Sequence, residues 1–133
     1  MGQIWQERYF DRWCDMNMHH PVRHISAEAA DAYCSWRELR LPTELELTAA
    51  MSLSPMGWQP SSLWEWTSSP FMPFEGFSPD PYEDYSKPWF DGKHRVLKGW
   101  SVFTPQYLRR PQFRNFYIPS RSDPFVGFRT CLP

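Results

Sequence analysis

The segment SAEAADAYCSWRELRLPTELELTAA, residues 26–50, decides the fold because it carries two helix signals in direct succession. Ser26 is suited to cap the first helix, and Glu28 lies in the first turn, where the helix dipole favours a negative charge. Apolar residues then recur at the i, i+3, i+4, i+7 spacing of a single helix face. This face, which we expect to be buried, consists of Ala29, Ala32, Tyr33 and Trp36.

The second helix signal begins at a capping box. Thr43 and Glu46 form the pattern T-x-x-E, in which each side chain satisfies the backbone N–H of the other residue. Leu45 and Ala49 continue an apolar stripe, so we expect them to be buried and the helix to end near Met51.

Strand signals follow the helices. Residues 63–67 (LWEWT) alternate as a half-buried strand does, and residues 95–103 and 126–131 are expected to form two more strands. Residues 1–24 show no clean periodicity, so we expect only a leading segment there. The segment 70–92 is rich in proline and aromatic residues and predicts a long, ordered loop that displays function.

Composition places residues 1–133 in one domain. Hydrophobic residues make up 41% and aromatic residues 18%, which is enough for a core and excludes a disordered chain. The 14 prolines argue against a helical bundle. Two helices, short strands and long loops together predict a single, loop-rich α+β domain.

Charge and apolar patterning exclude several partners. The formal net charge is -1, and Arg109-Arg110 is the one local basic cluster of the last third, so we expect no nucleic-acid partner. No apolar run approaches the roughly 20 residues that cross a bilayer, so we expect no membrane association. Cys14, Cys34 and Cys131 show no C-x-x-C spacing, which is typical of a reduced, cytoplasmic location.

Several catalytic patterns are missing. His19, His20 and His24 have no nearby carboxylate to complete a two-histidine, one-carboxylate face, so we expect no metal site in this chain. The sequence contains neither a G-x-S-x-G motif nor a glycine-rich phosphate loop. Cys34 lies beside the apolar stripe of the first helix, where a packed thiol is expected.

Two clusters remain as candidates for a binding site. Tyr82 and Tyr85 present phenols three residues apart, and the aromatic faces of Trp89 and Phe90 can hold a cation. The second cluster offers guanidinium groups that can clamp a carboxylate, together with an amide and aromatic rings. It consists of Arg114, Asn115, Phe116, Tyr117 and Arg121.

Together these clusters predict a shared pocket for a small zwitterion, formed by two loops that lie far apart in the chain. The alternative is that the tyrosines and arginines satisfy one another beneath long loops, as internal partners. Both interpretations follow from the same residue types.

The order of these segments resembles a known family. Residues 20–50 and the stretches LWEWTSSPF (63–71), PYEDYSKPWF (81–90), RPQFRNFYIPSR (110–121) and FVGFRTC (125–131) are similar to the formylglycine-generating-enzyme-like, or sulfatase-modifying-factor, domain. That domain is a variant of the C-type-lectin fold. The last three stretches look most like the C-terminal domain of ergothioneine-biosynthesis sulfoxide synthases and selenoneine synthases. The resemblance implies an α+β, C-type-lectin-like fold that lacks its N-terminal part.

In that branch a separate N-terminal helical domain supplies three histidines to a non-heme Fe(II). The resemblance therefore implies that this chain is the substrate-binding domain for oxidative C–S or C–Se bond formation on hercynine, a trimethylated histidine. A thiol or selenol donor would be the second substrate, and Fe(II) is expected on an iron-carrying helical domain, in cis or in trans. Residues 103–111 contain no cysteine, which excludes the copper site of the formylglycine-generating oxidases.

The motif match also implies roles for individual residues. Tyr82 and Tyr85 would be the catalytic phenols, one of them placed to donate a proton. The substrate-binding residues would be Asn115, Phe116 and Tyr117 around hercynine, and Arg114 and Arg121 as carboxylate partners.

One departure from the family pattern bears on the pocket. Trp100 stands where the family usually has a small residue, so we expect it to displace its neighbours. Two alternatives stay open: a non-catalytic, C-type-lectin-like binding module for a peptide, sugar or protein, and a truncated, inactive fragment. The binding module is favoured if Tyr82 and Tyr85 point away from Asn115 and Arg121.

Overall fold

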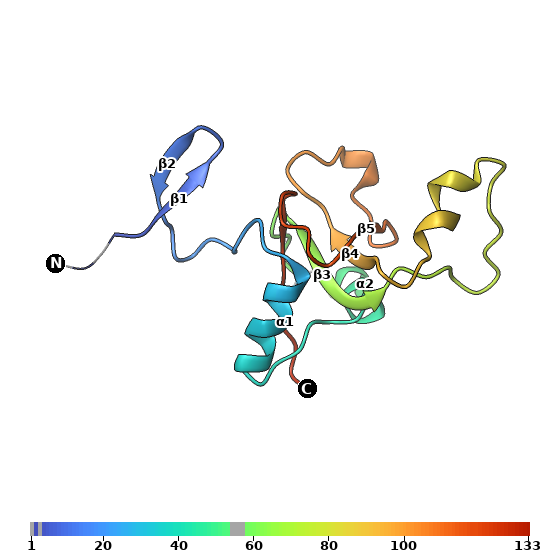
Figure 1. The fold of residues 1–133 in the computed structure, drawn as a ribbon, viewed down its shortest axis with the longest axis horizontal. Coiled ribbons are helices and arrows are strands. Elements are labelled where there is room, and N and C mark those ends of the chain that lie inside the picture. Colours follow the sequence, from blue (N-terminus) through green and yellow to red (C-terminus); the bar gives the residue numbers. More distant parts are fainter. Residues whose placement is uncertain (1, 3, 54–57) are drawn as a thin grey trace.

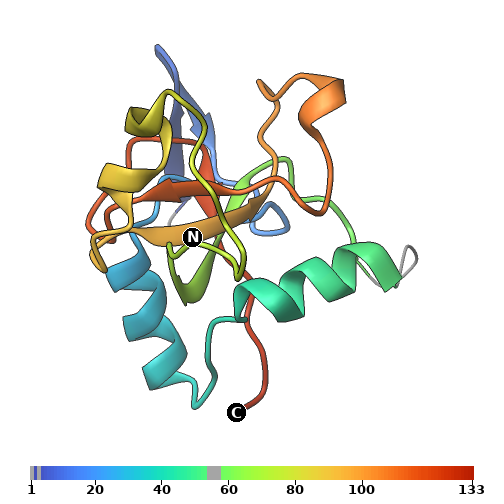
Figure 2. The same ribbon diagram turned by 90° about the vertical axis from the view of Figure 1, so that its right-hand side faces the viewer.

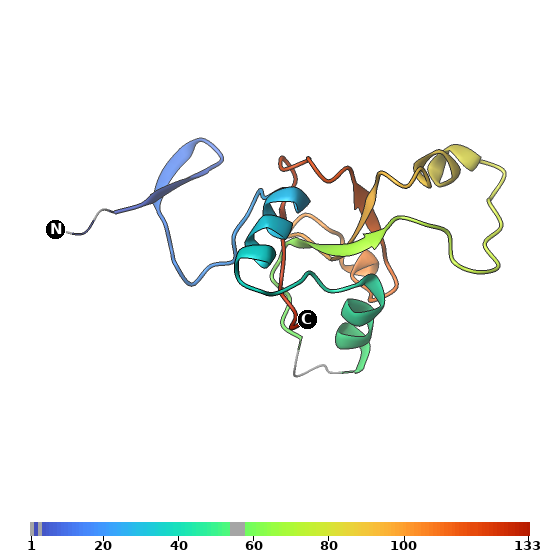
Figure 3. The same ribbon diagram turned by 60° about the horizontal axis from the view of Figure 1, so that its bottom comes forward.

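The computed structural model describes residues 2, 4–53 and 58–133 and consists of a small hairpin, two helices and a four-stranded sheet (Figure 1). The hairpin lies at one end of the molecule, and the segment with two short 3-10 helices projects at the other end (Figures 1 and 3). In chain order the elements are β1 (Gln6–Tyr9), β2 (Arg12–Asp15), α1 (Ala27–Trp36), α2 (Glu44–Leu53), β3 (Trp64–Pro70), η1 (Glu83–Tyr85), η2 (Lys87–Trp89), β4 (Arg95–Gly99), η3 (Gln106–Leu108), β5 (Asn115–Tyr117) and β6 (Val126–Gly127).

The four-stranded sheet has the order β5-β4-β3-β6. Strand β4 is antiparallel to both of its neighbours, whereas β3 and β6 are parallel. Trp64, Trp66 and Leu97 form the core with α1, and the Trp66 indole N–H donates to the Ile25 carbonyl at 2.8 Å. Helix α2 contacts β3 and β4. Figure 2 shows the two helices running in different directions, with residues 37–43 between them.

Helix α1 forms where expected, but it buries a different face. The Ser26 hydroxyl accepts the Ala29 N–H at 3.1 Å, which confirms the cap. The predicted buried face was wrong, because Ala27, Ala30 and Cys34 are buried while Trp36 is 73% exposed. The indoles of β3 fill the space beside the helix and leave room only for small side chains. Burial raises the pKa of the Cys34 thiol, as expected for a packed cysteine.

Helix α2 confirms the capping box. The Thr43 N–H donates to the Glu46 carboxylate at 2.8 Å, and the Glu46 N–H donates to the Thr43 hydroxyl at 3.2 Å. The expected stripe was wrong again, since Leu45 and Ala49 are exposed and Leu47 and Glu44 are buried. Glu44 forms an ion pair with Arg114 at 2.6 Å, and this pair lies on the buried side of the helix.

The strands differ from expectation mainly in burial and length. Residues 63–67 are buried at every position, not at alternate ones, because the sheet is covered on both faces. Strand β4 ends at Gly99, whose φ of +88 suits glycine, so the expected extension to residue 103 was wrong. Strand β6 stops at Gly127, where an added Cβ would lie 2.6 Å from the Val22 carbonyl oxygen.

The hairpin β1–β2 was missed in the sequence. Its residues are largely exposed, so no buried face gives them a periodic pattern. Phe10 at the turn has φ 53 and lies with its ring centroid 6.0 Å from that of Phe125. Trp100 comes directly after the last residue of β4, and its ring packs edge-on against that of Trp58, with the ring centroids 5.1 Å apart. Its bulky side chain therefore belongs to a position outside the strand. No helix among the described residues is long and apolar enough to span a membrane.

A buried ion pair crosses from β3 to the chain after β6. Glu65 is 2% exposed, and its carboxylate accepts from Arg129 at 2.5 and 2.8 Å and from the Ser61 hydroxyl at 2.8 Å. A carboxylate at this depth is tolerated because its charge and lone pairs are matched.

We predict that Arg129→Met lowers the free energy of unfolding by roughly 3–5 kcal/mol, because it leaves the Glu65 carboxylate buried without a cation. The double variant Glu65→Gln/Arg129→Met should be less destabilised than Arg129→Met alone. Arg110→Met, at an exposed arginine, is the matched control and should change stability by at most about 0.5 kcal/mol. Urea denaturation measures all four proteins, and equal losses for Arg129→Met and Arg110→Met would contradict the prediction.

Candidate functional site

A cleft of about 800 Å³ lies between the projecting segment and the edge strand β5. It is lined by Tyr82, Asp84, Trp89, His94, Asn115, Phe116, Tyr117, Ile118 and Arg121. Residues from the two predicted clusters therefore share one cavity, although about thirty positions separate them in the chain. A smaller cavity of about 220 Å³ lies at the base of the hairpin and contains none of these residues.

The register of β5 on β4 sets the wall of the cleft. Asn115 pairs with Leu97 and Tyr117 with Arg95, so both point to the face of the sheet that carries the core. The Asn115 amide donates to the Tyr117 hydroxyl at 3.4 Å, while its carbonyl oxygen accepts the Phe116 N–H at 2.8 Å. Backbone pairing and this local bond fix the polar side of the wall.

Aromatic rings connect β5 with the projecting segment. Phe116 stacks on Phe71 with ring centroids 4.1 Å apart and an interplanar angle of 11°. Trp89 in η2 lies 6.1 Å from the Phe116 ring, and its indole N–H donates to the Asp84 carbonyl at 3.0 Å. The lysine of η2, Lys87, bonds Glu83 of η1 at 3.0 Å. These contacts order the loop that the sequence predicts as a functional surface.

The sequence reasoning missed two lining residues, Ile118 and His94, of which His94 is the one that forms hydrogen bonds through its side chain. Its Nδ1 lies 3.0 Å from both carboxylate oxygens of Asp91, and Asp91 also accepts the N–H of Lys93 at 2.8 Å. The hydrogen bonds from His94 and then from Lys93 lower the pKa of Asp91 to about 2. The signal was the pattern D-G-K-H, in which Gly92 with φ +73 turns the chain back so that residues three apart can bond.

Arg121 lies in the cleft with a carboxylate partner of its own. Its guanidinium bonds Asp123 at 2.7 and 3.1 Å, which raises the pKa of Arg121, and it lies 4.5 Å above the Tyr117 ring. Both members of the pair are substantially exposed. A ligand carboxylate would therefore compete with Asp123 for the same guanidinium.

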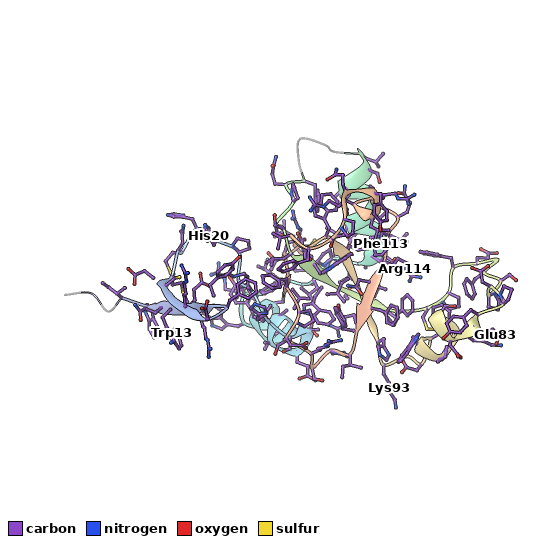
Figure 4. All side chains as sticks on the ribbon, turned by 90° about the horizontal axis from the view of Figure 1, so that it is seen from above. Trp13, His20, Glu83, Lys93, Phe113 and Arg114 are labelled. Carbon is purple, nitrogen blue, oxygen red and sulfur yellow. The ribbon has the colours of Figure 1, made fainter. Side chains whose placement is uncertain are left out.

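Arg114 is not brought into the cleft. Strand alternation turns it to the face opposite Asn115, where it lies 2.6 Å from Glu44 and donates to the Met72 carbonyl at 2.9 Å. Figure 4 shows Arg114 near the middle of the molecule, away from Glu83 on the projecting segment. Its geometry is that of an internal ion-pair partner, the alternative that the sequence left open.

The structure describes the side chain of only one of the two predicted catalytic tyrosines. Tyr82 lines the cleft beside Asn115 and Arg121, and its ring is 63% exposed. The backbone of Tyr85 belongs to η1, while its side chain lies outside the described part of the structure. The catalytic roles of both residues stay predictions.

The three histidines of the leading segment do not converge. His20 bonds the Asn17 side chain at 3.1 Å, whereas His24 Nδ1 bonds the backbone carbonyl of Pro124 at 2.9 Å. Within residues 2, 4–53 and 58–133, no group of three or more His, Cys, Asp or Glu side chains has the arrangement of a metal site. The described residues therefore do not fit an iron centre.

Comparison with known proteins identifies the family. Residues 1–59 and 62–132 match the sulfatase-modifying factor enzyme 1-like domain. The chain belongs to this family. Its α+β, loop-rich architecture is accordingly the C-type-lectin-like fold of formylglycine-generating-enzyme-type domains.

Curated relatives of this sulfatase-modifying-factor-type domain are named for hercynine or for ergothioneine biosynthesis. The chain is 32% identical to a hercynine oxygenase of Mycobacterium tuberculosis over 86% of its own length and 37% of the relative. It is 33% identical to a hercynine oxygenase of Mycolicibacterium smegmatis over 82% of its length and 36% of the relative. It is 35% identical to ergothioneine biosynthesis protein 1 of Schizosaccharomyces pombe, over 65% of its length and 12% of the relative. The chain thus spans little more than a third of the hercynine oxygenases that it matches.

On the face of the domain opposite Asn115, Lys98 lies near the Glu44–Arg114 pair. It is 1% exposed, and burial lowers its pKa from an ordinary 10.5 to about 8, with Arg114 adding to the effect and Glu44 opposing it. Between these two values the unfolded chain holds a proton that the folded chain lacks, so folding becomes more favourable as the pH rises.

We predict that the free energy of unfolding rises by about 1–3 kcal/mol between pH 8 and pH 10.5, relative to Lys98→Met, which has no group to titrate there. Urea denaturation of both proteins at intervals across that range measures the difference. A constant gap between them would contradict a depressed pKa for Lys98.

Proposed function

We propose that this chain is the substrate-binding domain of a non-heme-iron sulfoxide or selenoxide synthase-like protein that acts on hercynine. The observation that carries the proposal is the cleft in which aromatic rings, Asn115 and Arg121 line a single cavity. The names of the curated relatives, hercynine oxygenase and ergothioneine biosynthesis protein 1, favour the same substrate class.

The chemistry of the cleft suits each part of a betaine of histidine. Trp89 and Phe116 offer aromatic faces to a trimethylammonium group, which has no hydrogen to donate and is held by ring electrostatics. The exposed Asp84 carboxylate adds negative charge on that side. Arg121 offers a guanidinium fork to the carboxylate of the ligand.

Tyr82 is the proposed proton donor of the cleft, with Tyr85 as its neighbour in η1. A phenol hydroxyl is a hydrogen-bond donor that can give a proton to an oxygen atom during the reaction. A thiol or selenol donor would enter through the open side of the same cavity.

Iron is assigned to another domain. In this proposal an iron-carrying helical domain, in cis or in trans, supplies the oxidation chemistry, and the part of this chain is to bind and orient substrate. Tyr82 lies in the same cavity as Asn115 and Arg121, and for this one of the two tyrosines the arrangement supports the proposal over a lectin-like binding module.

The test of the proposal is binding of hercynine compared with histidine. We expect the purified chain to bind hercynine roughly 2- to 30-fold more tightly, because the quaternary ammonium gains about 0.5–2 kcal/mol from the aromatic faces. Trp89→Leu should remove most of this preference. Trp36→Leu, at an exposed tryptophan on α1, is the matched control and should leave it unchanged. Isothermal titration calorimetry gives each affinity, and equal or no binding of the two ligands by the unaltered chain would refute the proposal.

A second prediction concerns Asp123, the internal competitor for Arg121. Asp123→Asn should strengthen hercynine binding by up to about fivefold, because the guanidinium no longer has a charged partner at 2.7 Å. Arg121→Met should weaken binding, and the gain from Asp123→Asn should vanish in the double variant. Calorimetry of the three variants checks this, and a gain that persists without Arg121 would place the carboxylate contact elsewhere.

A further inference from the structure

In the His94–Asp91 pair, the ring nitrogen Nδ1 bonds the carboxylate, whereas Nε2 does not take part in this contact. Asp91 accepts the backbone N–H groups of Lys93 at 2.8 Å and His94 at 3.1 Å, so the carboxylate is fixed from its own turn. A carboxylate held in its ionised form by these bonds has only lone pairs to offer. The proton between the residues therefore belongs to His94 Nδ1, and in the neutral ring Nε2 carries a lone pair.

The position of Nε2 follows from the packing of the ring. Trp89 and Phe116 meet the imidazole edge to face, with centroids 5.4 and 5.7 Å away, and hold the side chain at 14% exposure. Among the described residues no side chain or backbone group bonds Nε2. Nε2 is also absent from the fully buried polar atoms that lack a hydrogen bond, so within the described part of the structure it keeps some exposed surface. His94 lines the cleft, and its Nε2, which no described group bonds, is the ring nitrogen left to face the cavity.

The other polar groups of the cleft are suited to different ligand atoms. The Asn115 carbonyl oxygen already accepts the Phe116 N–H, and Arg121 is a donor only. The Asp84 carboxylate is an exposed charge that suits a cation. His94 Nε2 is a neutral acceptor that carries no proton, unlike the phenol oxygens of Tyr82 and Tyr117, and its natural partner is an uncharged N–H.

We propose that His94 is a ligand-binding residue whose Nε2 accepts a hydrogen bond from the ring N–H of an imidazole-bearing ligand, with Asp91 as the positioning residue that fixes its tautomer. Applied to hercynine, this assignment rests on the proposed function and adds a specificity to it. The site selects ligands with a free ring N–H over ring-alkylated analogues.

Calorimetry with matched ligands and variants tests the contact. The unaltered chain should bind hercynine about tenfold more tightly than at least one of its two ring-N-methylated isomers, the loss expected for one buried hydrogen bond. In His94→Phe, which keeps an aromatic ring against Trp89 and Phe116, this discrimination should disappear. His94→Gln, whose amide oxygen can replace Nε2 as an acceptor, should restore part of it. Undiminished discrimination in His94→Phe would overturn the inference, whereas Tyr107→Phe, at an exposed residue outside the cleft, is the control for ring changes elsewhere.

Nuclear magnetic resonance separates this inference from the proposed function. Two-bond nitrogen–proton correlations of the ¹⁵N-labelled chain should show the proton of neutral His94 on Nδ1, and Asp91→Asn, which can donate to Nδ1, should move it to Nε2. Imidazole added at alkaline pH should shift the Nε2 signal, and 1-methylimidazole, with no N–H, should not. A proton on Nε2 in the unaltered chain, or equal shifts with both probes, would overturn the role of His94. A normal imidazole response without any preference for hercynine over histidine would refute the proposed function and leave the His94 acceptor standing.

Discussion

The pairing of β4 between β3 and β5 is the constraint on which the cleft depends. Strand β3 is buried at every position from Trp64 to Thr67, so a shift in the register of β4 would expose Val96 and Leu97, which are buried against it. Strand β5 takes its register from β4, and that register decides which of its residues reach the cavity. The wall of the site is therefore set by core packing some distance away.

The end of this short strand explains why two arginines seven positions apart, Arg114 and Arg121, have different surroundings. Arg114 faces the side of the sheet where Glu44 and Lys98 are buried, and a buried carboxylate beside a buried lysine needs a permanent cation with good geometry. Arg121 comes after β5 has ended, where its pair with Asp123 is exposed and exchangeable. Equal residue types in one motif thus divide into a structural and an accessible group.

The sequence was sufficient for features that depend on neighbouring residues. The cap at Ser26 and the box at Thr43 and Glu46 were predicted correctly because both are local hydrogen-bond patterns. The buried faces of α1 and α2 were wrong, since the indoles of β3 and the pairing of Glu44, which lie far off in the chain, decide which helix residues fit inside. His94 escaped notice for the same reason: its bond to Asp91 is local, but its place in the cleft depends on Phe116.

In the proposed function, the cleft divides recognition of the ligand among groups that do not compete with one another. Aromatic faces, a guanidinium fork and a neutral acceptor each suit a different part of one molecule, and each is held by a separate contact: Trp89 by Asp84, Arg121 by Asp123, and His94 by Asp91. Groups fixed before a ligand arrives lose little conformational entropy when it binds. In the proposed function, this rigidity is what a substrate-binding domain contributes to a reaction whose metal lies elsewhere, because a ligand held by three independent contacts can present only one of its ring atoms to the partner domain.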